Sequence, residues 1–293
     1  MTPLALLLAI ALGQCALMAL AWAVQRLTRQ SGWVDATWSF TVGGGGLCAA
    51  LIPVGDAALG ALPTSARQVL VATLVGLWSA RLAGHIALRT RGAGDDPRYA
   101  ELMRTWGAKA SSRLFWFLQS QAVAAALLAV TVYIAARNPA PGLGVLDVMG
   151  TLVLLAGIAG EGIADAQLTR FRHRAPIHAP NAHGRICDVG LWRWSRHPNY
   201  FFEWLIWLAY PCFALAPSAD GPWAWGWLAF IGPAMMYGLL VHVSGIPPLE
   251  AHMARSRGAA FAAYCRRTSA FFPCPRAGWT RISPLTIHRR SVQ

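Results

Sequence analysis

The chain has 293 residues, of which 56% are hydrophobic and 13% are charged, and its mean hydropathy is +0.42. Soluble globular proteins carry about 25% charged residues, so this composition excludes an ordinary soluble protein and predicts one that crosses a membrane several times. The net charge of +13 comes from 24 arginines and one lysine in short segments between apolar stretches, which is typical of membrane topology and not of nucleic-acid binding.

Seven apolar stretches approach the roughly 20 residues that a helix needs to cross a bilayer. They cover residues 4–24, 33–53, 66–88, 114–136, 145–168, 200–217 and 223–246. The first lacks the basic start and the small-residue cleavage site of a signal peptide, so we expect it to be retained as a span. The sequence therefore predicts an all-α, polytopic membrane protein with about seven transmembrane helices.

The basic residues predict the orientation of these helices. Of the 25 basic residues, 22 follow the first, third, fifth or seventh stretch, and the opposite loops contain only Arg67 and Arg137. Because basic loops stay in the cytoplasm, we expect the N-terminus outside and the C-terminus inside, in a membrane such as the bacterial inner membrane. Residues 1–275 would form one integral-membrane domain, followed by a basic, flexible cytoplasmic tail at 276–293.

The second and third stretches carry small and ionisable residues. Four consecutive glycines at 43–46 lack the context of a nucleotide-binding loop, so we interpret them as a site of close helix approach. Asp35 would act either as a protonated donor facing an apolar cavity or as a solvated residue in an interfacial aromatic belt. Arg81 and His85 lie four residues apart on one helical face, where burial beside an acid is one interpretation.

The fifth stretch ends with Glu161 and Asp165, again four residues apart, and arginines follow at once. Metal binding is a weak interpretation, because the histidines are dispersed, and the six cysteines form no C-x-x-C pair. Carboxylates that accept from a ribose, followed by guanidinium groups that hold phosphate, fit the residue order better. A salt-bridged helix end is the alternative.

Residues 184–207 join a basic, turn-rich loop to an apolar helix. Pro198 suits an early helical position, and Asn199 and Glu203 then share one face. An ionisable residue beside a lipid-length apolar run is a functional hypothesis by default, which makes Glu203 a candidate site residue. The neighbouring arginines are also explained by the topology alone.

The motifs of the chain, taken in order, resemble the bacterial branch of the steroid 5-alpha reductase family, formerly DUF1295. The matching patterns are G-W-V-D-A-T-W at 32–38, G-D-D-P-R-Y at 94–99, D-x-G-L-W-R-x-S-R-H-P-N-Y-x-x-E at 188–203, S-G-I-P-x-L-E at 244–250 and Y-x-x-R-T-S-x-F-x-P at 264–273. The resemblance implies a seven-helix membrane fold and NADPH-dependent reduction of a carbon–carbon double bond conjugated to a ketone, in an apolar, sterol- or isoprenoid-like substrate.

The resemblance also implies which residues contact the cofactor and the substrate. Residues that match the family's dinucleotide contacts are Asp165, Arg172, Arg185, Asn199 and Glu203, and we expect Glu161, Trp192, Arg196, His197, Tyr200 and Tyr264 to complete the cofactor site. The family's substrate-binding Glu is matched loosely by Asp35, and its partner Tyr has no match near His85. The predicted catalytic residues are therefore Asp35, His85 and Glu203, without a metal ion.

Two other classes of function stay open. The same residues resemble a wider group that includes isoprenylcysteine and phospholipid methyltransferases, which carry an R-H-P-x-Y motif and a C-terminal Glu with a downstream Tyr and bind S-adenosylmethionine. In this chain Arg196 to Tyr200, Glu250 and Tyr264 suit that interpretation. A non-catalytic scaffold or a transporter would bind no cofactor, and the repeats common in transporters are not found in the sequence.

Overall fold

The computed structural model describes residues 1–55, 64–91, 97–173, 185–217, 221 and 223–275. The tail at 276–293 and most of the turn at 94–99 lie outside the described residues. Within the described ranges the regular structure is helical throughout. The α-helices are α1 (Pro3–Thr28), α2 (Trp33–Leu51), α3 (Ala66–Arg91), α4 (Pro97–Trp106), α5 (Ala110–Ala136), α6 (Val145–His173), α7 (Pro198–Leu208), α8 (Tyr210–Ala214), α9 (Ile231–Tyr237) and α10 (Ile246–Arg267). Short 3-10 helices are η2 (Gly107–Lys109), η4 (Gly190–Arg193) and η5 (Ala224–Phe230), and η6 (Gly238–Val243) is a π-helix.

Five helical segments are long and apolar enough to cross a membrane. They are α1, α3, the segment Tyr99–Ala136, α6 and the segment Ala224–Arg267. The other two predicted stretches are also helical, but α2 has only 19 residues, four of them glycine, and the sixth stretch is divided into α7 and α8 next to Pro211. The prediction of an all-α membrane protein is confirmed at this level.

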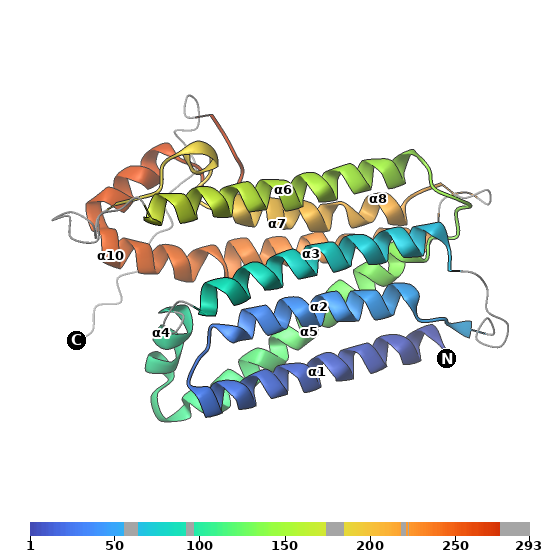
Figure 1. The fold of residues 1–293 in the computed structure, drawn as a ribbon, viewed down its shortest axis with the longest axis horizontal. Coiled ribbons are helices and arrows are strands. Elements are labelled where there is room, and N and C mark those ends of the chain that lie inside the picture. Colours follow the sequence, from blue (N-terminus) through green and yellow to red (C-terminus); the bar gives the residue numbers. More distant parts are fainter. Residues whose placement is uncertain (56–63, 92–96, 174–184, 218–220, 222, 276–293) are drawn as a thin grey trace.

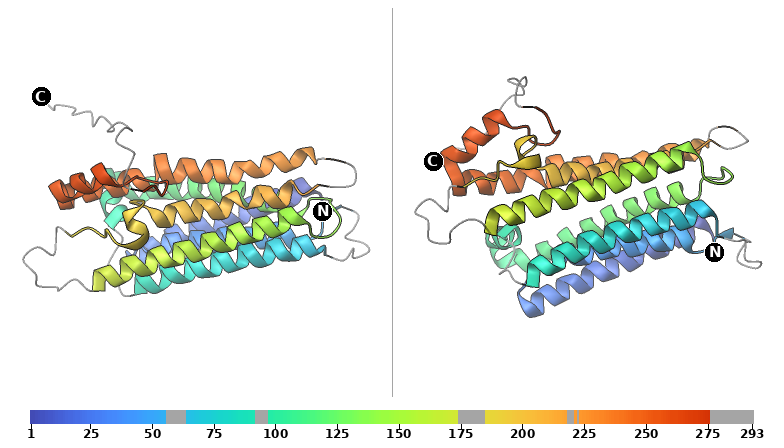
Figure 2. Two further views of the ribbon diagram at one scale, coloured as in Figure 1. Left: turned by 90° about the horizontal axis from the view of Figure 1, so that it is seen from above. Right: turned by 45° about the horizontal axis from the view of Figure 1, so that its top comes forward.

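The helices lie side by side in one elongated bundle (Figures 1 and 2). One half consists of α1, α2 and α5, which contact each other, and the other half contains α6 packed against α7 and α8. Helix α3 contacts α2, α5 and α6, so it joins the two halves. The N-terminus lies at one end of the bundle, and α4 and α10 lie at the other, which we call the α10 end.

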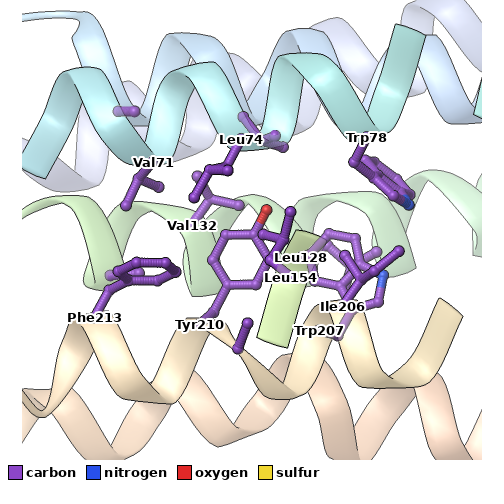
Figure 3. Packing of buried hydrophobic residues seen from close by; sticks show 14 of the residues in the cluster. Val71, Leu74, Trp78, Leu128, Val132, Leu154, Ile206, Trp207, Tyr210 and Phe213 are labelled. Atoms are coloured by element: carbon purple, nitrogen blue, oxygen red, sulfur yellow. The ribbon is translucent and has the colours of Figure 1, made fainter. Parts of the chain in front are cut away.

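The core of the bundle is an apolar cluster shared by α3, α5, α6, α7 and α8 (Figure 3). Trp78, Trp207, Tyr210 and Phe213 are fully buried in it, and the ring of Trp207 stacks on Tyr210 with 5.2 Å between centroids. Lipid tails are as apolar as these side chains, so helix association in a membrane relies on close packing of this kind.

At the end opposite α10, the first turn of α3 is tied to the start of α6 by a buried ion pair. Arg67 donates to both carboxylate oxygens of Asp147, at 2.7 and 2.9 Å, and to the backbone carbonyls of Asn138, Ala140 and Gly142. Both charged side chains are at most 3% exposed. Such a pair is tolerated only because every polar group in it has a partner.

The four-glycine run of α2 packs against neighbouring helices. A methyl group on Gly43 would lie 2.1 Å from Ser79 Oγ, and one on Gly46 would lie 2.9 Å from a methyl carbon of Val75. A methyl group on Gly44, by contrast, would meet nothing within 4 Å. The interpretation of this run as a site of close helix approach is therefore confirmed.

We expect Gly43→Ala to lower the free energy of unfolding by about 1–3 kcal/mol, because α2 and α3 must separate to accept the methyl group. Its neighbour Gly44 is the matched control, since Gly44→Ala should raise stability by about 0.5–1 kcal/mol through helix propensity alone. Denaturant unfolding of both variants in detergent micelles measures the difference. Equal stabilities would contradict the proposed packing of α2 on α3.

Candidate functional site

A buried ion-pair network joins α3 to α6 in the half of the bundle nearer the α10 end. Arg81 on α3 lies 2.5 Å from a carboxylate oxygen of Glu161 and 2.5 Å from one of Asp165. The two acids are four residues apart on α6 and so lie on the same helical face. His85, one turn after Arg81, places its Nε2 3.6 Å from Asp165. Arg81 and His85 on α3 therefore face Glu161 and Asp165 on α6 across the helix interface.

Glu203 on α7 lies in the same region of the bundle. Its two oxygens accept hydrogen bonds from the indole N–H groups of Trp78, at 2.9 Å, and Trp207, at 3.0 Å. The side chain is 6% exposed, and no cation of the described residues lies within ion-pair distance of it. Pro198 opens α7 as predicted, which sets Glu203 one and a half turns into the helix.

Two glycines of α6 bring Glu161 and Glu203 into one layer. A methyl group on Gly157 would lie 2.5 Å from Ile206, and one on Gly160 would lie 2.4 Å from the ring of Phe202. Only glycine at these positions lets α7 approach α6 this closely. Glu203 then lies in electrostatic range of both Arg81 and Glu161. We refer to Arg81, Glu161, Asp165 and Glu203 as the polar layer.

Asp35 belongs to a second pair, with a tyrosine that the sequence analysis did not assign to the site. Tyr99 on α4 donates a hydrogen bond from its hydroxyl to Asp35 Oδ1 at 2.8 Å, and the tyrosine is buried against α5. The sequence analysis found no tyrosine near His85 to accompany Asp35, and the structure shows that Tyr99 lies beside this acid. The motif at 94–99 was the available signal.

The pair of Asp35 and Tyr99 lies at the same depth in the bundle as His85. Helices α2 and α3 run in opposite directions, and two hydrogen bonds set their register on either side of these residues. These bonds run from Ser79 Oγ to the carbonyl of Ser39, at 3.0 Å, and from Thr90 Oγ1 to the carbonyl of Gly32, at 3.1 Å. The acid, the tyrosine and the histidine therefore occupy the α10 end of the bundle.

The loop before α7 is bound to α10 through Glu250. Arg196 donates to both oxygens of Glu250, at 2.7 and 3.1 Å, and to the carbonyl of Thr268 at 2.6 Å. The ring nitrogen Nε2 of His197 lies 2.9 Å from Glu250 Oε1, and burial lowers the pKa of this imidazole. Most donors of Arg196 are thus used within the protein, so its predicted phosphate contact would have to replace or share them.

Two aromatic residues predicted to contact the cofactor support this loop. Trp192 donates from its indole to the carbonyl of Ala164, at 2.9 Å, and Tyr264 donates from its hydroxyl to the carbonyl of Trp192, at 2.5 Å. Both side chains are buried. Their polar atoms are occupied by backbone carbonyls, so both residues help to position the loop.

The remaining predicted residues lie near the surface at the α10 end. Arg172 and Arg185 are exposed, and the guanidinium group of Arg185 lies over the ring of Phe171 at 5.0 Å. Asn199 is half-buried in the first turn of α7, and the ring of Tyr200 stacks on His197, with 5.5 Å between centroids. The structure thus places exposed basic groups and a buried polar layer in the same half of the bundle. It does not bring the arginines into contact with the layer.

Comparison with known proteins identifies one matching family. The family model described as "Protein of unknown function (DUF1295)" matches residues 21–268, which include the polar layer, the pair of Asp35 and Tyr99, and the loop before α7. No curated protein and no solved structure matches the chain.

We expect Arg81→Met to lower the free energy of unfolding by about 3–5 kcal/mol, because it leaves Glu161 and Asp165 buried without their cation. The triple variant that also carries Glu161→Gln and Asp165→Asn should regain most of the lost stability, because neither side chain then carries a charge that needs Arg81. Unfolding in mixed micelles measures both variants. Arg104→Met is the control, because Arg104 forms its pair with Glu101 on the exposed surface of α4. Equal effects of Arg81→Met and Arg104→Met would contradict the assigned role of the network.

Proposed function

The chain belongs to the DUF1295 family, and we propose that it is a membrane-embedded, NADPH-dependent oxidoreductase that reduces the carbon–carbon double bond of an apolar enone. One observation carries this proposal: four ionisable side chains from three helices meet in a buried layer of a bundle whose helices are apolar enough to span a membrane. Ionisable groups at such depth are costly and mark functional sites. NADPH, when bound, supplies a hydride.

The proposal includes a topology in which α2 and the α7–α8 segment complete seven spans. The last turns of α1, α3 and α6, which carry basic residues, all lie toward the α10 end, together with α10 and its basic residues (Figure 1). Because basic loops stay on the cytoplasmic side, we propose that this end faces the cytoplasm of a bacterial cell and the N-terminus faces outside. The cofactor would then enter from the compartment in which it is available.

The residues at the α10 end fit a dinucleotide phosphate. Arg172 and Arg185 present exposed guanidinium groups, which match phosphate oxygens in shape and charge. In the polar layer, Arg81 Nη1 and Glu161 Oε2 are engaged with each other in an ion pair at 2.5 Å, and Asp165 lies one turn further toward the C-terminal end of α6. We therefore assign the phosphates to Arg172 and Arg185, the ribose to Asp165, and the remaining polar contacts to Asn199 and Glu203. Arg196 and His197 hold the loop through Glu250.

The pair of Asp35 and Tyr99 is our candidate for the substrate end of the site. Reduction of an enone develops negative charge on the carbonyl oxygen, and a preorganised donor stabilises that charge by about 3 kcal/mol in a dry site. The hydroxyl of Tyr99 becomes such a donor when the carbonyl oxygen takes its single proton in place of Asp35, which holds the hydroxyl in position at 2.8 Å in the ligand-free protein. Asp35 therefore acts through Tyr99, and His85 lies at the same depth on α3.

A second candidate function is transfer of a methyl group from S-adenosylmethionine. The structural observation in its favour is that Arg196 and His197, of the R-H-P-x-Y motif, both contact Glu250. In the resembling methyltransferases these two motifs belong to one cofactor pocket. A non-catalytic scaffold or transporter is the third class, and it would bind neither cofactor.

Direct titration of the purified protein with NADPH, NADH and S-adenosylmethionine tests the proposal. We expect NADPH to bind most tightly, and Arg185→Gln to raise its Kd about tenfold, or ~1.4 kcal/mol, because one phosphate contact is lost. Arg113→Gln, which alters another exposed arginine at the start of α5, is the matched control and should leave the Kd unchanged. Binding of S-adenosylmethionine in place of both dinucleotides would reject the reductase.

We expect Tyr99→Phe to lower turnover about a hundredfold while the Kd of NADPH stays the same, because one donor to the developing oxyanion is removed. NADPH consumption with a panel of sterol-like and isoprenoid ketones measures turnover. Tyr133→Phe, in the half-buried part of α5 beside Arg137, is the control. Wild-type turnover of Tyr99→Phe would remove Tyr99 from the substrate site.

A further inference from the structure

The polar layer contains more acid than base. Glu161, Asp165 and Glu203 contribute three carboxyl groups, and Arg81 is the one permanent cation among the described residues in ion-pair contact with them. Glu161 is 4% exposed and Glu203 is 6% exposed, so water cannot screen their charges. If all three acids were ionised, the layer would carry an excess of two negative charges in the interior of the bundle. Isolated buried charges are strongly disfavoured.

The elements packed against α6 and α7 offer no second permanent cation inside the bundle. His85 of α3 contacts Asp165 and is 35% exposed. Helix α8 contributes Tyr210, which is fully buried and whose hydroxyl has no hydrogen-bond partner among the described residues. Helix α9 contributes Tyr237, which packs against the ring of Trp204, and Arg193 of η4 is exposed. Arg172 of α6 also acts electrostatically on Asp165, but it is exposed. The excess charge of Glu161 and Glu203 must therefore be balanced by something other than these side chains.

The atoms of the layer point to a proton as the balancing group. Glu161 Oε2 lies 2.5 Å from Arg81 Nη1, which can only donate, so this oxygen carries the negative charge of the ion pair. No group of three or more His, Cys, Asp or Glu side chains in the described part of the chain is arranged to hold a metal ion. Glu203 has no cation of the described residues within ion-pair distance, which makes it the better carrier of a proton; its two oxygens accept from indole N–H groups, which a neutral carboxyl group also allows.

We infer that at neutral pH the pair of Glu161 and Glu203 holds one exchangeable proton, carried mainly on Glu203. This proton neutralises one of the three carboxylates, and Arg81 balances the charge of a second. The one remaining negative charge lies next to Arg81 and the half-exposed His85. His85 also gives a route for the proton, since it lies between Asp165 and the surface at the α10 end.

The use of this proton rests on the proposed function. In the reduction of an enone, a hydride forms a C–H bond at the β-carbon, the carbon–carbon π bond breaks, and the released electron pair takes up a proton at the α-carbon. The nicotinamide cofactor is oxidised by two electrons. A protonated Glu203 would be the source of the proton within the bundle, and cytoplasmic water would return one to the layer through His85.

Infrared spectroscopy of the ligand-free protein in detergent tests the inference without any cofactor. A protonated carboxylic acid has a carbonyl stretching band that a carboxylate lacks, and the band shifts when the solvent is exchanged for D2O. We expect the wild-type protein to show this band at neutral pH and to lose it in Glu161→Gln and in Glu203→Gln, because either change removes one acid from the layer. Glu101→Gln, on the exposed surface of α4, is the matched control and should retain the band.

Loss of the band in only one of the two variants would also support the inference, and would assign the proton to that residue. Absence of the band from the wild-type protein, or its persistence in both variants, would overturn it. If a variant fails to fold, absence of the band from the wild-type protein still overturns the inference, and the remaining variant still tests the assignment. If the protein shows the band but binds no NADPH, the proton site stands and the proposed function fails. If it binds NADPH but lacks the band, the proposed function stands and the proton site fails.

Discussion

The pairing of Arg81 with two acids of α6 is the interaction on which the arrangement of the bundle depends. Helix α3 joins the half formed by α1, α2 and α5 to the half formed by α6, α7 and α8, and Arg81 is its buried charge at that junction. A guanidinium group at this depth is tolerated only with its partners, so α6 must present Glu161 and Asp165 at one level. The same constraint aligns α7, because glycines of α6 bring Glu203 into that layer.

The loop before α7 and helix α10 form a second unit at the α10 end of the bundle. Glu250 binds both Arg196 and His197, and Tyr264 binds the carbonyl of Trp192. These contacts join segments more than 50 residues apart and so bring the motifs at 188–203, 244–250 and 264–273 together. They also separate the predicted site residues in space, since one group supports the loop and the other holds the ionisable side chains of the polar layer.

Much of the site was predictable wherever a functional pair lies within one helix. The spacings of Glu161 with Asp165 and of Arg81 with His85 were visible because residues four apart share a helical face. Pairs that cross between helices were not visible, and Tyr99 was missed as the partner of Asp35 for this reason. The proposed phosphate contact of Arg196 had the same weakness, because the sequence does not show that Glu250 occupies its guanidinium group.

The sequence by itself determined that the chain is helical and apolar, where its basic segments lie, and which residues share a helical face, because composition and helical periodicity are local properties. Only the tertiary structure decided which faces meet: that Glu161 and Asp165 share Arg81, and that the indoles of Trp78 and Trp207 bind Glu203. Contacts between helices depend on how closely the backbones approach, and here that approach is set by a few glycines whose neighbours the linear order does not reveal.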